Sequence, residues 1–178
     1  MDEVDRRAVL DEWFRTYADR LLAYLLHRTD RETAQDVLQE LFMTAYRKAP
    51  DVPEPPVGWL FATARRLLAN KRRGLRRHDD LLARLADDVA TTNDEPVAEL
   101  KQAFAQTLAA LSPGDREVLT LSGWYGLTPA EAAQALDCSP NAYNVRLHRA
   151  RRRLSEHLTS AGYEAGTPAG QLAEALRG

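Results

Sequence analysis

Two short helices joined by a tight turn are predicted for residues 127–154, and no other segment constrains the fold as much. Thr128 is placed to cap the first helix, with Pro129 at its first position and Glu131 at its third, a combination that satisfies free backbone amides at a helix start. Asp137 falls in the turn, where an aspartate tolerates a positive φ. The segment therefore predicts a helix-turn-helix.

The second of these helices has one apolar and one polar face. Ser139 is its expected cap and Pro140 its first residue. The apolar stripe comprises Tyr143, Leu147, Ala150 and Leu154. The side chains left outward are Asn141, Asn144, Val145, His148 and Arg149. Such a helix can enter the major groove of DNA, where arginine pairs with guanine and asparagine with adenine.

Further arginines on this helix are expected to contact phosphates. They are Arg146, Arg151, Arg152 and Arg153. The alternative is a solvated basic face in an ordinary helical bundle. Two caps and a turn in one segment favour DNA binding, with less information on which DNA sequence is bound.

The formal net charge of -2 does not argue against DNA binding, because acidic and basic residues are segregated along the chain. Acidic residues dominate 79–99, which predicts either a functional linker or a plain spacer. With 178 residues and 44% hydrophobic side chains, the chain is long enough for two small domains. A single cysteine, Cys138, excludes an internal disulfide and a clustered thiolate metal site.

The amino-terminal part predicts three helices. The first runs to about Leu26, and the second is capped by Asp30 and ended by Pro50. Inward residues of the first are Val9, Leu10, Trp13, Phe14, Tyr17, Leu21, Leu22, Leu25 and Leu26. Inward residues of the second are Ala34, Val37, Leu38, Leu41, Phe42, Ala45 and Tyr46. Its outward polar face comprises Asp36, Gln39, Glu40 and Arg47.

Prolines in residues 50–58 predict a stiff, exposed loop before the third helix, which runs from Trp59 to about Arg77. Its inward residues are Leu60, Phe61, Ala64, Leu67 and Leu68. Its outward residues form a second basic surface: Arg65, Arg66, Lys71, Arg72, Arg73, Arg76 and Arg77.

The carboxyl-terminal part predicts about four helices. One carries Leu100, Phe104, Leu108 and Leu111, a break follows at residues 112–114, and residues 115–124 form the helix before the helix-turn-helix. The tail after Leu158 has no readable role. The expected fold is all-α, with two small helical domains at 1–78 and 100–158, an acidic linker at 79–99 and a tail at 159–178.

Catalysis is not expected. The four histidines lie far apart in the chain and none stands beside a nucleophile in a recognisable pattern, so no catalytic residue, metal site, cofactor or small-molecule substrate is predicted. No window approaches the roughly 20 apolar residues that span a bilayer, and no export signal is recognisable. A cytoplasmic protein without membrane insertion is the expectation.

Three motifs follow one another along the chain: DVLQELFMTAYR at 36–47, GWLFATARRLLANKRR at 58–73 and the segment from Leu108 to Leu154. In this order they resemble the extracytoplasmic-function (ECF) branch of bacterial RNA polymerase sigma factors. The resemblance covers most of the chain. It implies a protein that binds core RNA polymerase, directs it to promoter DNA and helps to open it, with catalysis left to the polymerase. It also implies that an anti-sigma factor could be a partner.

The resemblance also implies roles for individual residues. Asp36, Gln39 and Glu40 match the face that grips the polymerase. The loop 50–57 and the third helix resemble the part that captures the minus-ten element and the melted strand, with contacts from Trp59, Arg65, Arg66, Lys71, Arg72 and Arg73. Trp59 could instead anchor the core. The minus-thirty-five element would be read by Asn141, Asn144, Val145, Arg146, His148, Arg149 and Arg152.

Two departures from the family pattern predict an unusual promoter sequence. Asn144 stands where the family often has lysine or arginine, and Val145 where it often has serine. Asp137 also replaces the usual glycine of the turn. Two other classes stay open: a stand-alone helix-turn-helix regulator, which would dimerise to read two half-sites, and a sigma-like decoy that binds polymerase or an inhibitory partner without starting transcription.

Overall fold

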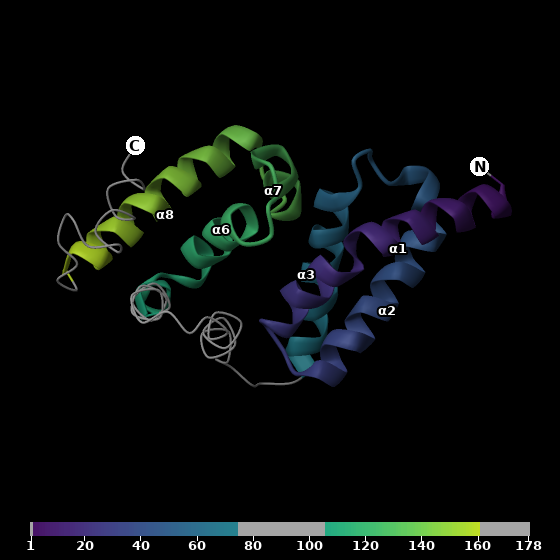
Figure 1. Cartoon of the computed structure of the whole chain (residues 1–178), viewed down its shortest axis with the longest axis horizontal. Coiled ribbons are helices and arrows are strands. Elements are labelled where there is room, and N and C mark those ends of the chain that lie inside the picture. Colours follow the sequence, from purple (N-terminus) through teal and green to yellow (C-terminus); the bar gives the residue numbers. More distant parts are fainter. Residues whose placement is uncertain (1, 75–105, 161–178) are drawn as a thin grey trace, which may run out of the picture. The chain divides into compact units, whose positions relative to one another are not determined.

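The computed structural model describes residues 2–74 and 106–160, which form helices and contain no strand (Figure 1). The predicted all-α class is confirmed. Two compact units are present: one holds Met1–Asp79 and Leu127–Pro140, the other Asp80–Gly126 and Asn141–Gly178. The linker 79–99 and most of the tail lie outside the described residues, so the predicted domain boundaries stay a prediction.

The first unit contains three long helices. They are α1 (Glu3–Leu26), α2 (Arg31–Lys48) and α3 (Val57–Gly74), and a short 3-10 turn, Ala49–Asp51, follows α2. A capping box between Asp2 and Asp5 starts α1. Within these three helices, the core side chains with 0% or 1% exposure are Leu21, Leu25, Ala34, Val37, Leu41, Ala45, Leu60, Phe61 and Ala64. These are the apolar positions whose helical spacing predicted the fold, with Ala34 and Ala45 allowing close helix contact.

Phe14 was predicted to face inward, and this is wrong: its exposed fraction is 52%. Its ring lies against that of Phe42, with the centroids 4.9 Å apart. Phe14 shares the helix face of Leu21, seven residues away, so the sequence pattern is the same at both positions. Leu21 is covered on all sides, whereas at Phe14 the ring contact with Phe42 leaves half of the side chain in water.

The proline-rich loop differs from the prediction at its end. Helix α3 begins at Val57, two residues before Trp59, and Pro56, Val57 and Gly58 are buried. The preceding Pro53, Glu54 and Pro55 are exposed as expected. Val57 begins the helix because it adds one more apolar residue to the buried face, and Pro56 supplies the first carbonyl, which accepts from the Leu60 amide at 2.9 Å.

Helix α3 is buried on more than one side. Leu60 to Ala64 are consecutive and each is at most 7% exposed. Consecutive helical residues point about 100° apart, so a buried run of this length goes around the whole helix. The sequence predicted inward positions for Leu60, Phe61 and Ala64, but not for Ala62 or Thr63. The additional cover comes from α7 (Pro129–Ala135), which packs on α3 within the same unit.

Gly58 makes the close approach of α7 possible. A Cβ atom at this position would lie 2.8 Å from the backbone carbonyl oxygen of Glu131 and would also overlap the side chain of Gln134. A backbone oxygen cannot move aside as the end of a flexible side chain can. Glycine is therefore required at position 58 by the neighbouring helix.

Gly58→Ala is expected to lower the melting temperature, although alanine is intrinsically better than glycine in a helix by about 1 kcal/mol. The clash with Glu131 would outweigh that gain if α7 is seated as described. Gly114→Ala is the matched control, because a Cβ there meets nothing within 4 Å. Thermal unfolding of both variants measures the sign, and a melting temperature raised by Gly58→Ala would contradict the packing of α7 on α3.

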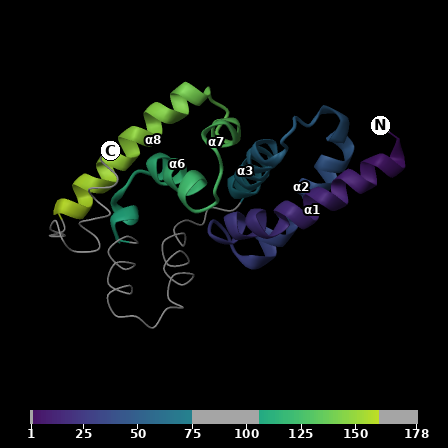
Figure 2. The same cartoon turned by 45° about the horizontal axis from the view of Figure 1, so that its top comes forward.

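The second unit is built on α6 (Pro113–Gly123) and α8 (Pro140–Ser160), which run side by side (Figure 2). Its best buried side chains are Leu108, Val118, Leu121, Tyr143, Ala150, Leu154 and Leu158. Residues 106–110 are helical, and the guanidinium of Arg116 donates to the carbonyls of Leu108, Ala109 and Leu111 at 3.0–3.2 Å. One side chain thus satisfies the end of the preceding helix.

Helix α6 starts at Pro113, two residues before the predicted start. The predicted break at residues 112–114 is the helix start itself: Ser112 caps, and its Oγ accepts from the Asp115 amide at 3.2 Å. Proline at the first helical position loses no hydrogen bond, so it belongs to the helix here.

Candidate nucleic-acid interface

The outer face of α8 is as predicted. All of the residues expected to point outward are exposed: Asn141, Asn144, Val145, His148 and Arg149. All of those expected to point inward are buried: Tyr143, Leu147, Ala150 and Leu154. The geometry therefore presents amide, imidazole, guanidinium and one aliphatic group on a single solvent-facing side of a helix.

Tyr143 fixes the rotation of α8 about its own axis. Its side chain is 0% exposed, and its hydroxyl oxygen lies 2.9 Å from the Val118 carbonyl oxygen and 2.5 Å from Ser122 Oγ, both on α6. A buried hydroxyl that donates to a carbonyl permits one rotational setting of the helix that carries it. The outward residues of α8 keep their direction for this reason.

Two of the arginines assigned to phosphates already have acidic partners. Arg153 Nη1 pairs with Asp115 Oδ2 at 2.5 Å, which ties the later turns of α8 to the first turn of α6. Arg152 Nε lies 3.4 Å from Glu156 Oε1 on its own helix. Arg146, Arg149 and the neighbouring Arg151 are exposed. Their guanidinium groups face water and are the more accessible donors.

The turn before α8 has the predicted geometry. Asp137 has φ 55°, the left-handed region that an aspartate adopts more readily than most residues. Thr128 and Glu131 form the predicted capping box at the start of α7, with the Glu131 carboxylate accepting from the Thr128 amide at 2.8 Å. Residues 127–160 therefore contain a capped helix, a left-handed turn and a second helix, the order of a helix-turn-helix.

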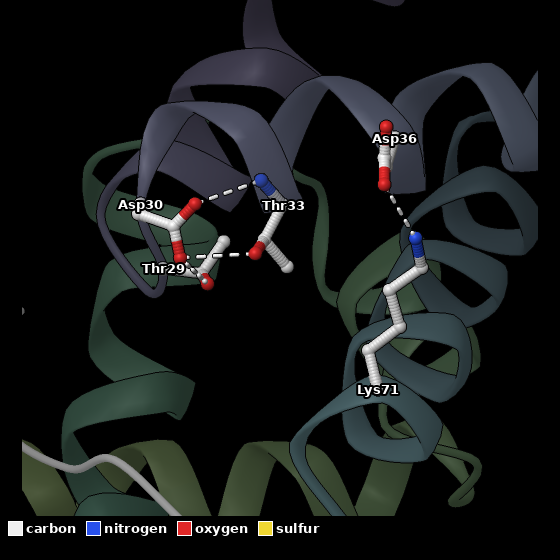
Figure 3. A network of polar contacts seen from close by, with 5 residues as sticks. All are labelled: Thr29, Asp30, Thr33, Asp36 and Lys71. Atoms are coloured by element: carbon white, nitrogen blue, oxygen red, sulfur yellow. Dashed lines mark hydrogen bonds and ion pairs between the residues drawn. The ribbon is translucent and has the colours of Figure 1, made fainter. Parts of the chain in front are cut away.

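The basic side of α3 is partly engaged by neighbours within its unit. Arg65 and Arg66 are exposed. Lys71 Nζ lies 3.0 Å from Asp36 Oδ2 on α2, and Arg72 donates to the backbone carbonyl of Arg28 (Figure 3 shows the Lys71 pair). The side chain of Arg73 lies outside the described residues.

Trp59 is neither fully buried nor fully exposed. Its burial therefore does not decide between the two predicted roles, contact with the melted strand and anchoring of the core. A tryptophan in this state keeps part of its ring available for stacking while the rest packs on the protein. Its assignment to the melted strand stays a prediction.

The polar face of α2 is exposed at Asp36, Gln39 and Glu40, as predicted. Sequence reasoning missed Met43, which follows Gln39 and Glu40 on the same face and is 58% exposed. Met43 was assigned to neither face of the helix, although its position at i+3 and i+4 from two outward residues was a signal for exposure. This face therefore offers one apolar group among polar ones.

The start of α2 is stabilised by a small polar network around Asp30 (Figure 3). One carboxylate oxygen accepts from the Thr33 amide at 2.8 Å, and the other accepts from the hydroxyls of Thr33 and Thr29 at 2.9 and 3.3 Å. The hydrogen bond from the Thr33 backbone is the main cause that lowers the pKa of Asp30 below its usual value, and the Thr33 hydroxyl adds to it.

Asp30→Ala is expected to lower the free energy of unfolding by about 1 kcal/mol at neutral pH. Because the folded pKa is lowered, this contribution is present above the unfolded pKa and is lost as pH falls through the folded pKa. Urea unfolding from pH 7 down to pH 3 should show the difference between wild type and Asp30→Ala shrinking with acid. Asp30→Asn, which caps without a charge, should show no such pH dependence; a pH-independent wild-type advantage over Asp30→Ala would contradict the carboxylate's role.

Within residues 2–74 and 106–160, no cluster of three potential metal ligands is found. The helices of this part of the chain are also all too short or too polar to cross a membrane.

Two family models match the chain. The model described as Sigma-70 region 2 matches residues 13–78, and the one described as Sigma-70, region 4 matches residues 101–154. The first match contains α2 and α3, and the second contains α6, α7 and most of α8. Both matches cover the motifs that carried the resemblance.

Individual relatives agree with the family models. The ECF RNA polymerase sigma factor SigM of Bacillus subtilis is 30% identical over 151 residues, which covers 82% of this chain and 92% of SigM. The ECF RNA polymerase sigma factor SigL of Mycobacterium tuberculosis is 32% identical over 165 residues, covering 88% of this chain and 90% of SigL.

Among solved structures, CnrH in complex with the cytosolic domain of CnrY is similar with a TM-score of 0.58 and 27% identity, covering 86% of this chain and 90% of CnrH. The sigma factor RpoE in complex with the anti-sigma factor NepR from Bartonella quintana shares the fold with a TM-score of 0.55 at 23% identity. With two matched sigma-70 regions and full-length relatives at this level of identity, the chain belongs to the ECF family of RNA polymerase sigma factors.

Proposed function

We propose that this chain binds core RNA polymerase through α2, carries it to promoters read by α8 and helps to separate the DNA strands with α3. The observation that carries the proposal is the outer face of α8, whose base-reading side chains are all exposed on a helix held in one rotational setting by Tyr143. Membership of the family supports RNA polymerase as the partner, and the exposure of these side chains supports their assignment to DNA.

The polymerase contact is assigned to Asp36, Gln39 and Glu40. They are exposed and follow one another along one face of α2, a helix whose opposite face is fully buried at Val37 and Leu41. Because its buried face already holds α2 in place, the helix needs little further ordering when a partner binds, which lowers the entropic cost of binding.

The promoter contacts divide between two helices. Asn141, Asn144, His148 and Arg149 on α8 are suited to base edges of the minus-thirty-five element, and Arg146 to the backbone. Arg65 and Arg66 on α3, with the half-buried Trp59, are suited to phosphates and an unpaired base of the minus-ten element.

The proposal includes a protein without catalytic activity of its own that acts in the cytoplasm, where the polymerase works. It also includes control by an anti-sigma factor. The similarity to CnrH, a protein solved with the cytosolic domain of CnrY bound, supports a protein partner of this kind.

Run-off transcription tests the proposal. Purified core polymerase is incubated with a pool of bacterial genomic fragments, with and without this protein. Discrete new start sites that share an upstream motif are expected. Binding to polymerase without new start sites would leave a decoy instead, and neither result would leave a stand-alone regulator.

A charge reversal sharpens the same experiment. Glu40→Lys on the proposed polymerase face should weaken binding to core polymerase and reduce all transcripts together. Glu12→Lys makes the same change at an exposed site on α1 and should leave both unchanged. Equal effects of the two variants would remove α2 from the proposal.

A further inference from the structure

We propose that Val145 contacts the C5-methyl group of a thymine in the minus-thirty-five element. The promoters that this chain recognises therefore require a thymine at one position, for its methyl group. The proposal rests on the proposed function of α8 and adds the chemical group that one residue recognises. Thymine is the base whose major-groove edge carries a methyl group, and aliphatic side chains are the natural contacts for it.

Val145 does not belong to the core. It is 44% exposed, whereas Tyr143 and Leu147 on either side are 0% and 8% exposed. Two residues along a helix turn the direction by about 200°, so Val145 points away from the face that those two residues bury. No packing requirement of its unit explains an aliphatic side chain at this position.

The immediate surroundings of Val145 are polar except for the small side chain of Ala142, three residues earlier. Asn141 lies one turn earlier on the same face, Arg149 lies one turn later, and Asn144 and Arg146 are its neighbours in the chain. All four are exposed. A valine is intrinsically less favourable than alanine, arginine or glutamine in a helix, so an exposed valine here is not selected by helix formation.

Valine is also prepared for contact. Its branched side chain has one strongly preferred rotamer in a helix, so it loses little freedom when it meets a methyl group. On entering the groove it can exclude water from one base edge, while Asn144 and Arg149 supply the hydrogen bonds at others. This division of labour accounts for an apolar residue inside a polar reading face.

The position of the thymine relative to a guanine follows from helix geometry. Val145 and Arg149 are four residues apart, which is about 6 Å along α8. Base pairs follow one another at about 3.4 Å. The thymine read by Val145 should therefore lie about two base pairs from the guanine read by Arg149.

Uracil substitution tests the methyl group alone. Each thymine in the minus-thirty-five element of a promoter found by run-off transcription is replaced in turn by deoxyuridine, and binding of the complete polymerase complex is measured. At one position, the wild-type complex should lose about fourfold in affinity, the amount expected for burying one methyl group. In a complex with Val145→Ala the difference between the thymine and uracil promoters should be clearly smaller, because alanine lacks the two γ-methyl groups of valine.

Matched variants separate this role from others. Asn144→Ala, a change at the next residue, should weaken binding but keep the sensitivity to uracil at that position. Cytosine at the position should bind poorly to the wild-type complex, and 5-methylcytosine should recover part of the loss. The melting temperature of Val145→Ala should equal or slightly exceed that of wild type, since the side chain is outside the core and alanine is the better helix former.

The results distinguish failure of this inference from failure of the proposed function. Selective initiation with no uracil position that depends on Val145 would overturn the methyl contact and leave the sigma-factor function intact. If the wild-type complex shows no selective initiation at all, the function proposed for α8 itself is overturned.

Discussion

Arg149→Ala is expected to reduce the preference of the polymerase complex for its own promoters by about fivefold or more, because a bidentate arginine–guanine pair contributes about 1–3 kcal/mol of discrimination. Arg149 is exposed on the outer face of α8, at the position suited to a guanine edge. The measurement is competition between a cognate promoter and the same fragment with a scrambled minus-thirty-five element, at fixed salt.

Arg151→Ala is the matched control for Arg149→Ala. It removes the same charge from the same helix, two residues away and about 200° around the axis. It should weaken binding to both competitors alike, by lowering the electrostatic attraction to phosphates and the dependence on salt. If Arg149→Ala leaves the preference unchanged, α8 does not read the promoter through this residue.

Tyr143→Ala is expected to lower the free energy of unfolding of the second unit by about 3–5 kcal/mol. The change empties a fully buried aromatic site between α6 and α8 and removes the hydroxyl that bonds to Val118 and Ser122. Urea unfolding followed by circular dichroism should show a lower midpoint for one part of the transition, since the chain has two compact units.

Tyr143→Phe separates packing from hydrogen bonding. It keeps the ring and removes the hydroxyl, so the expected loss is about 1 kcal/mol. His148→Ala, on the outer face of the same helix, should change stability by less than about 0.5 kcal/mol. A stability of Tyr143→Ala close to that of wild type would mean that α8 is not held to α6 by this side chain.

Local features of the sequence predicted the helices well. The cap residues Asp30 and Thr128 start helices because their side chains reach amides only three residues away, and such contacts are readable from a short segment. The outer face of α8 was predicted for the same reason: helical periodicity alone separates Tyr143 and Leu147 from the residues between them.

Contacts between distant parts of the chain could not be predicted in this way. The packing of α7 on α3 depends on the close approach of Gly58 and Glu131. These residues are far apart in the sequence, and nothing in the sequence indicates that they meet. Ala62 and Thr63 on α3 are buried as a result of this packing. In the sequence, however, small residues outside the apolar pattern look the same whether they are buried or exposed. Phe14 is the opposite case. It follows the apolar helical pattern, but its neighbours leave half of its side chain exposed.

Family resemblance assigned Asp36 to a protein partner and Lys71 to DNA, and in the structure these two residues form one ion pair. A group that binds Asp36 competes with Lys71, and the released ammonium becomes available to a phosphate. Binding of either ligand breaks the same ion pair, so the second ligand no longer has to break it. The coupling free energy between the two ligands must be equal in both directions. An exposed pair of this kind is worth at most about 1 kcal/mol. With Asp36 assigned to polymerase and Lys71 to promoter DNA as proposed, the two partners would raise each other's affinity through this contact by up to about fivefold.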